Sequence, residues 1–383
     1  MSEAIEPFSL HVEDAVLDDL HARLALTRFP DQIDGTGWDG GTPVAYVREL
    51  VDYWRDGYDW RAQEARLNEF PQFRTTIDGQ PIHFVHARSR HENALPLILI
   101  HGWPGSIVEF LDVIPRLTDP EAYGGTAEDA FDVVAPSLPG YALSPPTRER
   151  GWDIVRIARA FVELMARLGY GRYGAQGGDW GAQIATRIGA FDPEHCAGIH
   201  LNLTVAGRAP DDGPPLTDEE QADLATMGRF QSEEAGYANE QGTKPQTLGM
   251  ALNDSPAGLL AWIVEKFRGW SDCDGDPETV FTRDQLLTNV MLYWVTQTIT
   301  SSVRLYWESR LSGIWSTPPD PVLVPTGIAR YPKEEILRFP RSWVEQIYNV
   351  TYWSVLPRGG HFAAMEQPEL FVDDVRKFFA TVR

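Results

Sequence analysis

Apolar positions in the first 70 residues recur with the spacing of an α-helix. Within residues 12–26 the apolar side chains Val12, Val16, Leu20 and Leu24 form one stripe. Residues 44–54 carry a second helical pattern, and a third short one ends before a proline at position 71. The sequence therefore predicts a helical N-terminal extension over residues 1–72.

The pattern then changes to strands and afterwards to strands that alternate with helices. Residues 73–77 and 82–86 alternate around Asp78-Gly79, which predicts a β-hairpin. The segments that follow predict, in order, a strand at 95–101, a helix at 107–117, a strand at 131–136, a helix at 153–168, a strand at 172–176, a helix from 182 and a strand at 196–203. This order favours a parallel sheet with helices on both faces.

The alternation stops near residue 205. Residues 209–215 are rich in Pro, Asp and Gly, which is typical of a loop. Helical patterns then extend to about residue 313, at 216–230, 257–267 and 283–307. Strand patterns return afterwards at 321–326 and 352–356. A separate helical domain would also give such a block, but the returning alternation favours a cap inserted into the sheet. We predict a first core segment at 73–204, a helical cap at 205–316 and a second core segment at 317–383.

Composition and charge limit the classes of function. The chain has 383 residues, of which 43% are apolar and 23% charged, as in soluble globular proteins. The net charge of −22 disfavours binding to nucleic acid. The strongly apolar run 95–100 is far shorter than the ~20 residues of a membrane span, and the acidic N-terminus lacks the apolar region of a signal peptide. With only Cys196 and Cys273, far apart, we expect no disulfide framework and a cytoplasmic protein.

The chemistry is indicated by Gly177-Gly-Asp179-Trp-Gly181, which stands between the strand and helix patterns at 172–176 and from 182. Strand, tight turn and helix together are typical of the nucleophile elbow of α/β-hydrolases. Here the exposed position is a carboxylate, which favours attack on an electrophilic sp³ carbon and an alkyl ester that water must later cleave. The alternative is a turn in which Asp179 only caps a helix.

A base and its acid are expected later in the chain, because the order in this fold is nucleophile, acid, histidine. His361 follows Gly359-Gly360 in the loop between the last strand and a C-terminal helix at 369–381, and it suits the role of a base that activates water. The acid should follow the strand at 321–326. Glu334 and Glu335 both lie there, and spacing alone does not separate them.

Two backbone N–H groups are expected to form an oxyanion hole. Trp103 lies in His101-Gly-Trp-Pro-Gly at the end of a predicted strand, and Trp180 directly follows the nucleophile. Each such donor contributes roughly 3 kcal/mol to stabilising a tetrahedral oxyanion.

These motifs together resemble the microsomal-type epoxide hydrolases, a family that includes the juvenile hormone epoxide hydrolases and soluble bacterial and fungal members. The resemblance extends over nearly the whole chain. It rests on Tyr58-Asp-Trp-Arg, His101-Gly-Trp-Pro-Gly-Ser, Gly177-Gly-Asp-Trp-Gly, Gly242-Thr-Lys-Pro, Ala251-Leu-Asn-Asp-Ser-Pro-Ala-Gly-Leu, Leu286-Leu-Thr-Asn-Val-Met-Leu-Tyr-Trp, Pro325-Thr-Gly and Gly359-Gly-His-Phe-Ala-Ala.

The resemblance implies a role for each site residue. Asp179 becomes the nucleophile and His361 the base. The family's acid precedes Ile-Leu-x-x-Pro, a pattern that fits Glu335-Ile-Leu-Arg-Phe-Pro and favours Glu335 over Glu334. The family's two cap tyrosines become Tyr237 and Tyr306, whose phenol groups donate to the epoxide oxygen as the ring opens.

The implied protein is a cytoplasmic epoxide hydrolase of α/β-hydrolase fold that needs no metal or organic cofactor. Its partner is a small epoxide, aryl or otherwise hydrophobic, in detoxification or natural-product biosynthesis. The membrane anchor of eukaryotic members is not expected, and a homodimer is one oligomeric state left open. Two alternatives are a haloalkane dehalogenase, which has little use for paired phenols, and a catalytically silent binding protein.

Overall fold

The computed structural model describes residues 4–206, 215–314 and 320–383. Within them one nine-stranded sheet has the order β1-β2-β3-β5-β4-β6-β7-β8-β9. The first three pairings are antiparallel, and the pairings from β5 to β9 are parallel. The strands are β1 (Glu6–Phe8), β2 (Gln72–Ile77), β3 (Gln80–Ala87), β4 (Leu95–Ile100), β5 (Phe131–Pro136), β6 (Tyr173–Gly177), β7 (Cys196–Leu201), β8 (Val322–Arg330) and β9 (Tyr348–Val355).

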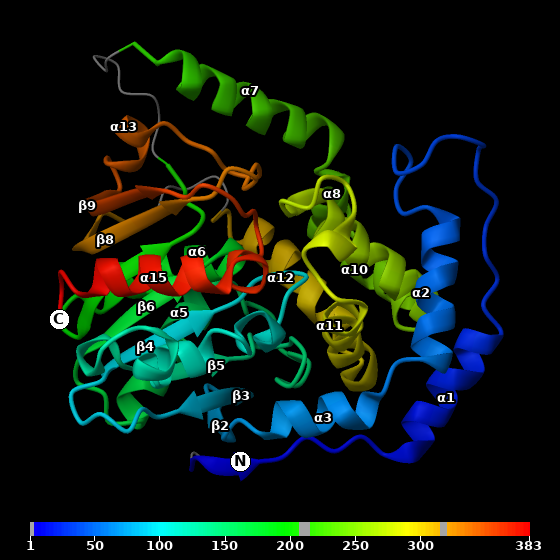
Figure 1. Ribbon diagram of the computed structural model, residues 1–383, viewed down its shortest axis with the longest axis horizontal. Helices are drawn as coiled ribbons and strands as arrows, with labels where there is room; N and C mark the ends of the chain where they lie inside the picture. The colour runs from blue at the N-terminus through cyan, green and yellow to red at the C-terminus, as the bar shows by residue number, and fades with distance from the viewer. Residues whose placement is uncertain (1–3, 207–214, 315–319) are drawn as a thin grey trace.

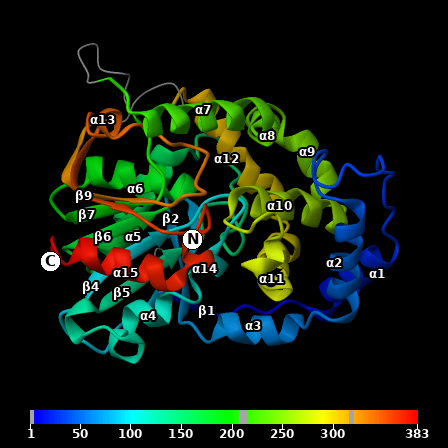
Figure 2. The same cartoon turned by 45° about the horizontal axis from the view of Figure 1, so that its top comes forward.

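Helices cover both faces of the parallel part of the sheet, as the alternation predicted. On β7, Ile199 faces α6 (Asp179–Phe191) at Gly189, while Gly198 faces α15 (Pro368–Phe379) at Phe378. The two helices therefore lie on opposite faces (Figures 1 and 2). The remaining core helices are α4 (Ile114–Thr118), α5 (Ile154–Arg167), α13 (Arg341–Val344), α14 (Ala363–Glu366) and the 3₁₀ helices η1 (Ile107–Phe110), η2 (Pro120–Tyr123) and η3 (Ala127–Asp129).

The predicted hairpin is confirmed. Strands β2 and β3 pair with Ile77 opposite Gln80, and the two turn residues Asp78 and Gly79 both have positive φ values, 48° and 76°. A two-residue hairpin turn requires this backbone, which explains the Asp-Gly pair.

The helical block is a cap beside the carboxyl ends of the parallel strands (Figure 1). Its elements are α7 (Asp218–Glu233), α8 (Gly236–Thr243), α9 (Pro245–Leu252), α10 (Pro256–Trp270), η4 (Pro277–Thr279), α11 (Arg283–Thr296) and α12 (Ile299–Leu311). Residues 209–214 of the loop predicted at 209–215, and the predicted boundary between residues 316 and 317, lie outside the described residues; the other domain boundaries stay predictions. Asp223 of α7 fastens the cap to the core, because its carboxylate binds Arg330 and, at 2.7 Å, Arg338.

The N-terminal extension is not purely helical. Its first element, β1, pairs with β2 and lengthens the sheet. The helices α1 (Asp14–Ala25), α2 (Val44–Asp56) and α3 (Trp60–Asn68) then follow the outer side of the cap (Figures 1 and 2). Arg23 binds Asp254 at 2.7 Å and the hydroxyl of Tyr53 donates to Asp284 at 2.7 Å, so this segment joins the sheet to the cap.

None of the helices in the described ranges combines the length and the apolar character that crossing a membrane requires.

Candidate active site

Asp179 stands at a sharp turn between β6 and α6. Its backbone has φ of 49°, a left-handed conformation that strains a residue with a side chain. The turn requires glycine on both sides: a Cβ on Gly177 would lie 2.2 Å from the carbonyl oxygen of Gly181, and one on Gly181 would lie 1.9 Å from that of Ile100. The elbow geometry expected from the sequence is therefore present, with a carboxylate at its apex.

The two carboxylate oxygens of Asp179 have different surroundings. Oδ1 accepts a 2.8 Å hydrogen bond from the backbone N–H of Trp103, and Oδ2 lies 3.4 Å from Nε2 of His361. Glycine at position 102 permits this approach, since a Cβ there would lie 2.1 Å from Oδ1. The Trp103 N–H thus points at the carboxyl group, while the oxyanion-hole roles of the Trp103 and Trp180 N–H groups stay predictions.

His101, in the same loop, has a structural role. Burial lowers the pKa of His101 to about 4, so the ring is neutral. Its Nδ1 donates to the Gly102 carbonyl at 2.9 Å, and its Nε2 accepts from the N–H of Leu138 at 3.2 Å. The imidazole therefore ties the Trp103 loop to the loop that follows β5.

The acid beside His361 is Glu334, and the preference for Glu335 was wrong. Oε2 of Glu334 lies 2.7 Å from Nδ1 of His361, and the Glu334 side chain is buried, whereas Glu335 is partly exposed. The physical reason is local: the chain leaves β8 in an irregular turn, in which the N–H of Glu334 bonds to the carbonyl of Tyr331 at 3.3 Å. This turn directs position 334 inward, so the family pattern was aligned one residue too far along.

The charges around His361 favour its protonated form. Burial alone would lower the pKa of His361, but attraction from Glu334 and hydrogen bonds to Asp179 and Glu334 outweigh burial and hold that pKa well above its ordinary value. These charges favour an imidazolium between two carboxylates in the free protein.

Replacing Glu334 with Gln is expected to lower the pKa of His361, because the ring loses its closest negative charge. Glu335→Gln, the matched control, should leave it unchanged. NMR titration of labelled imidazole carbons measures both. A fall in the Glu335 variant without one in the Glu334 variant would contradict the pairing seen in the structure.

The histidine loop is held by contacts that sequence reasoning missed. The Glu366 carboxylate accepts backbone hydrogen bonds from Gly360 at 3.0 Å, Phe362 at 2.9 Å and Asp272 at 2.8 Å. Burial raises the pKa of Glu366 to about 7. The N–H of His361 itself donates to the carbonyl of Trp270 at 2.8 Å. The end of α10 in the cap therefore sets the position of the histidine, and the only sequence signal was an acid five residues after it.

Tyr237 and Tyr306 come from α8 and α12 and meet above the elbow. Their ring centroids are 5.9 Å apart; Tyr237 stacks on Trp103 at 5.5 Å, and Tyr306 meets Trp180 edge-on at 4.8 Å. Burial, together with the charge of Asp179, raises the pKa of both phenols well above the ordinary value. Both are therefore neutral donors that lie within the electrostatic influence of the carboxylate.

A small cavity of about 10 Å³ lies beside the carboxylate, with room for about one water molecule. Asp179, His361 and Trp103 line it, together with Glu109 and Asn202, which the sequence analysis did not identify. Glu109 follows the Trp103 motif by a few residues, but nothing in the sequence pattern separates it from a surface acid.

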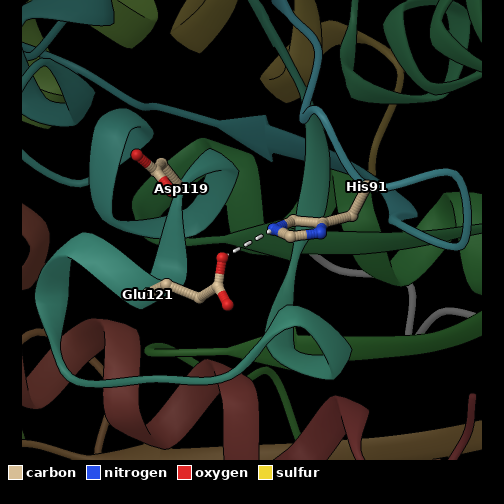
Figure 3. Close-up of side chains that lie close together, drawn as sticks. All are labelled: His91, Asp119 and Glu121. Carbon is tan, nitrogen blue, oxygen red and sulfur yellow. Dashed lines mark ion pairs between the residues drawn. The ribbon is translucent and has the colours of Figure 1, made fainter.

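One other cluster of metal-binding residue types occurs in the described ranges: His91, Asp119 and Glu121 (Figure 3). Nε2 of His91 lies 3.5 Å from Glu121, and Arg90 pairs with both Asp119 and Glu121. The guanidinium of Arg90 is therefore an ion-pair partner of both carboxylates. His91 precedes β4, whereas Asp119 and Glu121 precede β5, so the cluster lies at the amino ends of these parallel strands, away from the elbow, and is not part of the site.

Comparisons with known proteins agree with this geometry. Residues 5–110 match the family model described as epoxide hydrolase N terminus, and residues 95–251 match that of the alpha/beta hydrolase fold. The chain is 49% identical over 380 residues to a Stigmatella aurantiaca protein named as a candidate epoxide hydrolase, a match covering 99% of this chain and 86% of that protein. It is 39% identical over 410 residues to epoxide hydrolase 1 of Sus scrofa, covering 98% and 88%.

Among solved structures, the crystal structure of juvenile hormone epoxide hydrolase from the silkworm Bombyx mori superposes with a TM-score of 0.91 at 34% identity. The superposition covers all of this chain and 95% of that one.

Proposed function

Since the chain belongs to the epoxide hydrolase family and is an ether-bond hydrolase that converts epoxides to diols, we propose that Asp179 opens the ring as a nucleophile. The observation that carries this proposal is that the two carboxylate oxygens of Asp179 have different contacts. Oδ1 is held by the N–H of Trp103, and Oδ2 lies toward His361. One oxygen is anchored while the other can reach an epoxide carbon.

In the first step a bond forms between Oδ2 and the epoxide carbon as the ring C–O bond breaks. The ring oxygen gains negative charge and needs a proton donor on the side away from the carboxylate. Tyr237 and Tyr306 supply the donor groups, since both are buried neutral phenols whose pKa values are raised by burial and by the charge of Asp179. The product of this step is a hydroxyalkyl ester.

In the second step water cleaves the ester with His361 as base. Esterification removes the negative charge of Asp179, one of the two groups that hold the proton on the imidazolium. The pKa of His361 therefore falls once the ester has formed. The imidazolium gives up its proton, which restores the phenol that protonated the ring oxygen, and the neutral ring can then accept a proton from water. Glu334 orients the ring, and the oxyanion develops at Oδ1, in the hole formed by the N–H groups of Trp103 and Trp180.

The substrate in this proposal is an aryl or otherwise hydrophobic epoxide. Aromatic rings surround the nucleophile, and Trp270 packs at 4.9 Å against His361 and at 5.1 Å against Tyr237. Such a surface suits an apolar substituent next to a single polar ring oxygen. This preference fits detoxification and natural-product biosynthesis alike. A panel of aryl and alkyl epoxides with chiral analysis of the diols tests the substrate class.

A single turnover in ¹⁸O-water is expected to place the label in the protein at Asp179, while the first diol carries an unlabelled oxygen from the carboxylate. Mass spectrometry of the diol and of the peptide containing Asp179 measures both. Label in the first-turnover diol would mean direct attack by water and would rule out the ester.

A further inference from the structure

Glu109 is a carboxyl group in the active site for which the mechanism above has no use. It lies on η1, a few residues after the Trp103 N–H that holds Asp179, and it lines the same small cavity as Asp179 and His361. Gly105 leaves space for it, since a Cβ at position 105 would lie 1.6 Å from Oε1 of Glu109. The loop is therefore shaped around this carboxyl group.

The surroundings of Glu109 favour a neutral acid. No lysine or arginine in the described ranges forms an ion pair with it. Burial raises the pKa of Glu109 to about 8, the negative charges of Asp179 and Glu366 act in the same direction, and His361 opposes them. The nearby phenol of Tyr293 donates its proton to the Gly105 carbonyl at 2.6 Å. At pH 7 Glu109 therefore offers both a carbonyl oxygen and an O–H group.

The cavity next to Glu109 has the size and polarity that a water molecule requires. Its volume of about 10 Å³ accommodates about one water, which needs two to four polar partners. His361, Asp179, Glu109 and Asn202 all border it. A water in this cavity is bordered by both the nucleophile and the base.

We propose that Glu109 is a further catalytic residue, which holds the water that hydrolyses the Asp179 ester by accepting one of its hydrogens while the other points to Nε2 of His361. This inference rests on the ester mechanism proposed above. In this role Glu109 orients the attacking water. When Glu109 and His361 each accept one of its hydrogens, the water presents a lone pair to the ester carbon.

The step is balanced without a further reactant. The water oxygen bonds to Cγ of Asp179, one water proton moves to His361, and the other stays on the new hydroxyl group, still held by Glu109. Collapse breaks the bond from Cγ to the alkyl oxygen, which takes the proton from His361 and leaves as a diol hydroxyl. The carboxylic acid of Asp179 then gives its proton to His361, which restores the carboxylate and the imidazolium, and Glu109 is unchanged.

Two variants of equal side-chain length test the proposal in the full chain with styrene oxide as probe. Glu109→Met removes the hydrogen-bonding group, and Glu109→Gln keeps a carbonyl acceptor. Stopped-flow tryptophan fluorescence separates alkylation from hydrolysis, and intact-protein mass measures the ester. We expect Met to slow hydrolysis on the order of 10²-fold, with alkylation within about threefold of the wild type, and the ester to accumulate. Gln should restore hydrolysis to within about tenfold.

A control variant is Asp112→Asn, because Asp112 is an acid of the same segment that pairs with Arg66 at 2.7 Å at the surface. It should leave both steps unchanged. Hydrolysis at the wild-type rate in Glu109→Met, or equal slowing of both steps, would overturn the role of Glu109 and leave the ester mechanism standing. If a His361→Gln variant accumulates no ester under the same conditions, the mechanism and this inference fall together.

Discussion

Replacing His361 with Gln is expected to yield a protein that reacts once with an epoxide and then stops. The carboxylate of Asp179 and the Trp103 N–H that holds it remain in place, so alkylation proceeds. Glutamine cannot accept a proton from water, so hydrolysis of the ester should slow by on the order of 10²–10⁴-fold. Intact-protein mass spectrometry should show an increase equal to the mass of one epoxide.

The location of the added mass makes this test specific. Peptide mapping should place it on Asp179, and a double variant that also carries Asp179→Ala should gain no mass. Modification that survives the loss of Asp179 would show that a different group attacks the epoxide. Turnover by the His361 variant at the wild-type rate would show that the imidazole is not the base.

Removing the two phenol hydroxyls is expected to have a comparably large effect on ring opening, the first step of the reaction. Tyr237→Phe or Tyr306→Phe should each slow ring opening on the order of 10²-fold, since one donor to the developing alkoxide is lost. The double variant should be far slower than either single one, because the alkoxide then has no donor from the cap. Stopped-flow measurement of alkylation reports this step directly.

Tyr348→Phe is the matched control for the phenol variants. Tyr348 is also buried, but its hydroxyl hydrogen-bonds to Thr186 at 3.0 Å in the core, between α6 and β9. Its loss should leave ring opening unchanged. Full activity in both cap variants, or an equal loss in Tyr348→Phe, would contradict the assignment of the cap phenols as proton donors.

Much of the fold could be predicted from the sequence because hydrophobic periodicity reports burial, and the strands of the parallel sheet are buried on both faces. Breaks inside helices were less visible. Residues 107–117 were expected to be one helix, but Pro115 cannot donate a backbone hydrogen bond, and the segment divides into η1 and α4. The predicted helix at 283–307 divides at Gln297, which ends α11 with a φ of 53°. A glycine at this position would have indicated the break in the sequence, but the residue is glutamine.

The site residues were likewise predictable only where a regular local pattern marks them. Asp179 and His361 could be identified because glycines and flanking elements fix their positions. The choice between Glu334 and Glu335 depended on the shape of an irregular turn, which has no periodicity. Glu109 and Glu366 were missed because their importance comes from burial next to segments that are distant in the sequence, and a carboxylate on a short helix gives no sign of that.

The N-terminal segment has a consequence for how this enzyme can be recombined with its relatives. Its first strand extends the sheet, while Arg23 and Tyr53 bind Asp254 and Asp284 of the cap. The cap and the first 70 or so residues are thus a single unit of exchange, although the strands β2 to β7 separate them in the sequence. A cap transplanted from a relative without its own N-terminal helices would face foreign partners along this whole side. Exchange of the cap in this protein is therefore expected to require two distant segments of the gene.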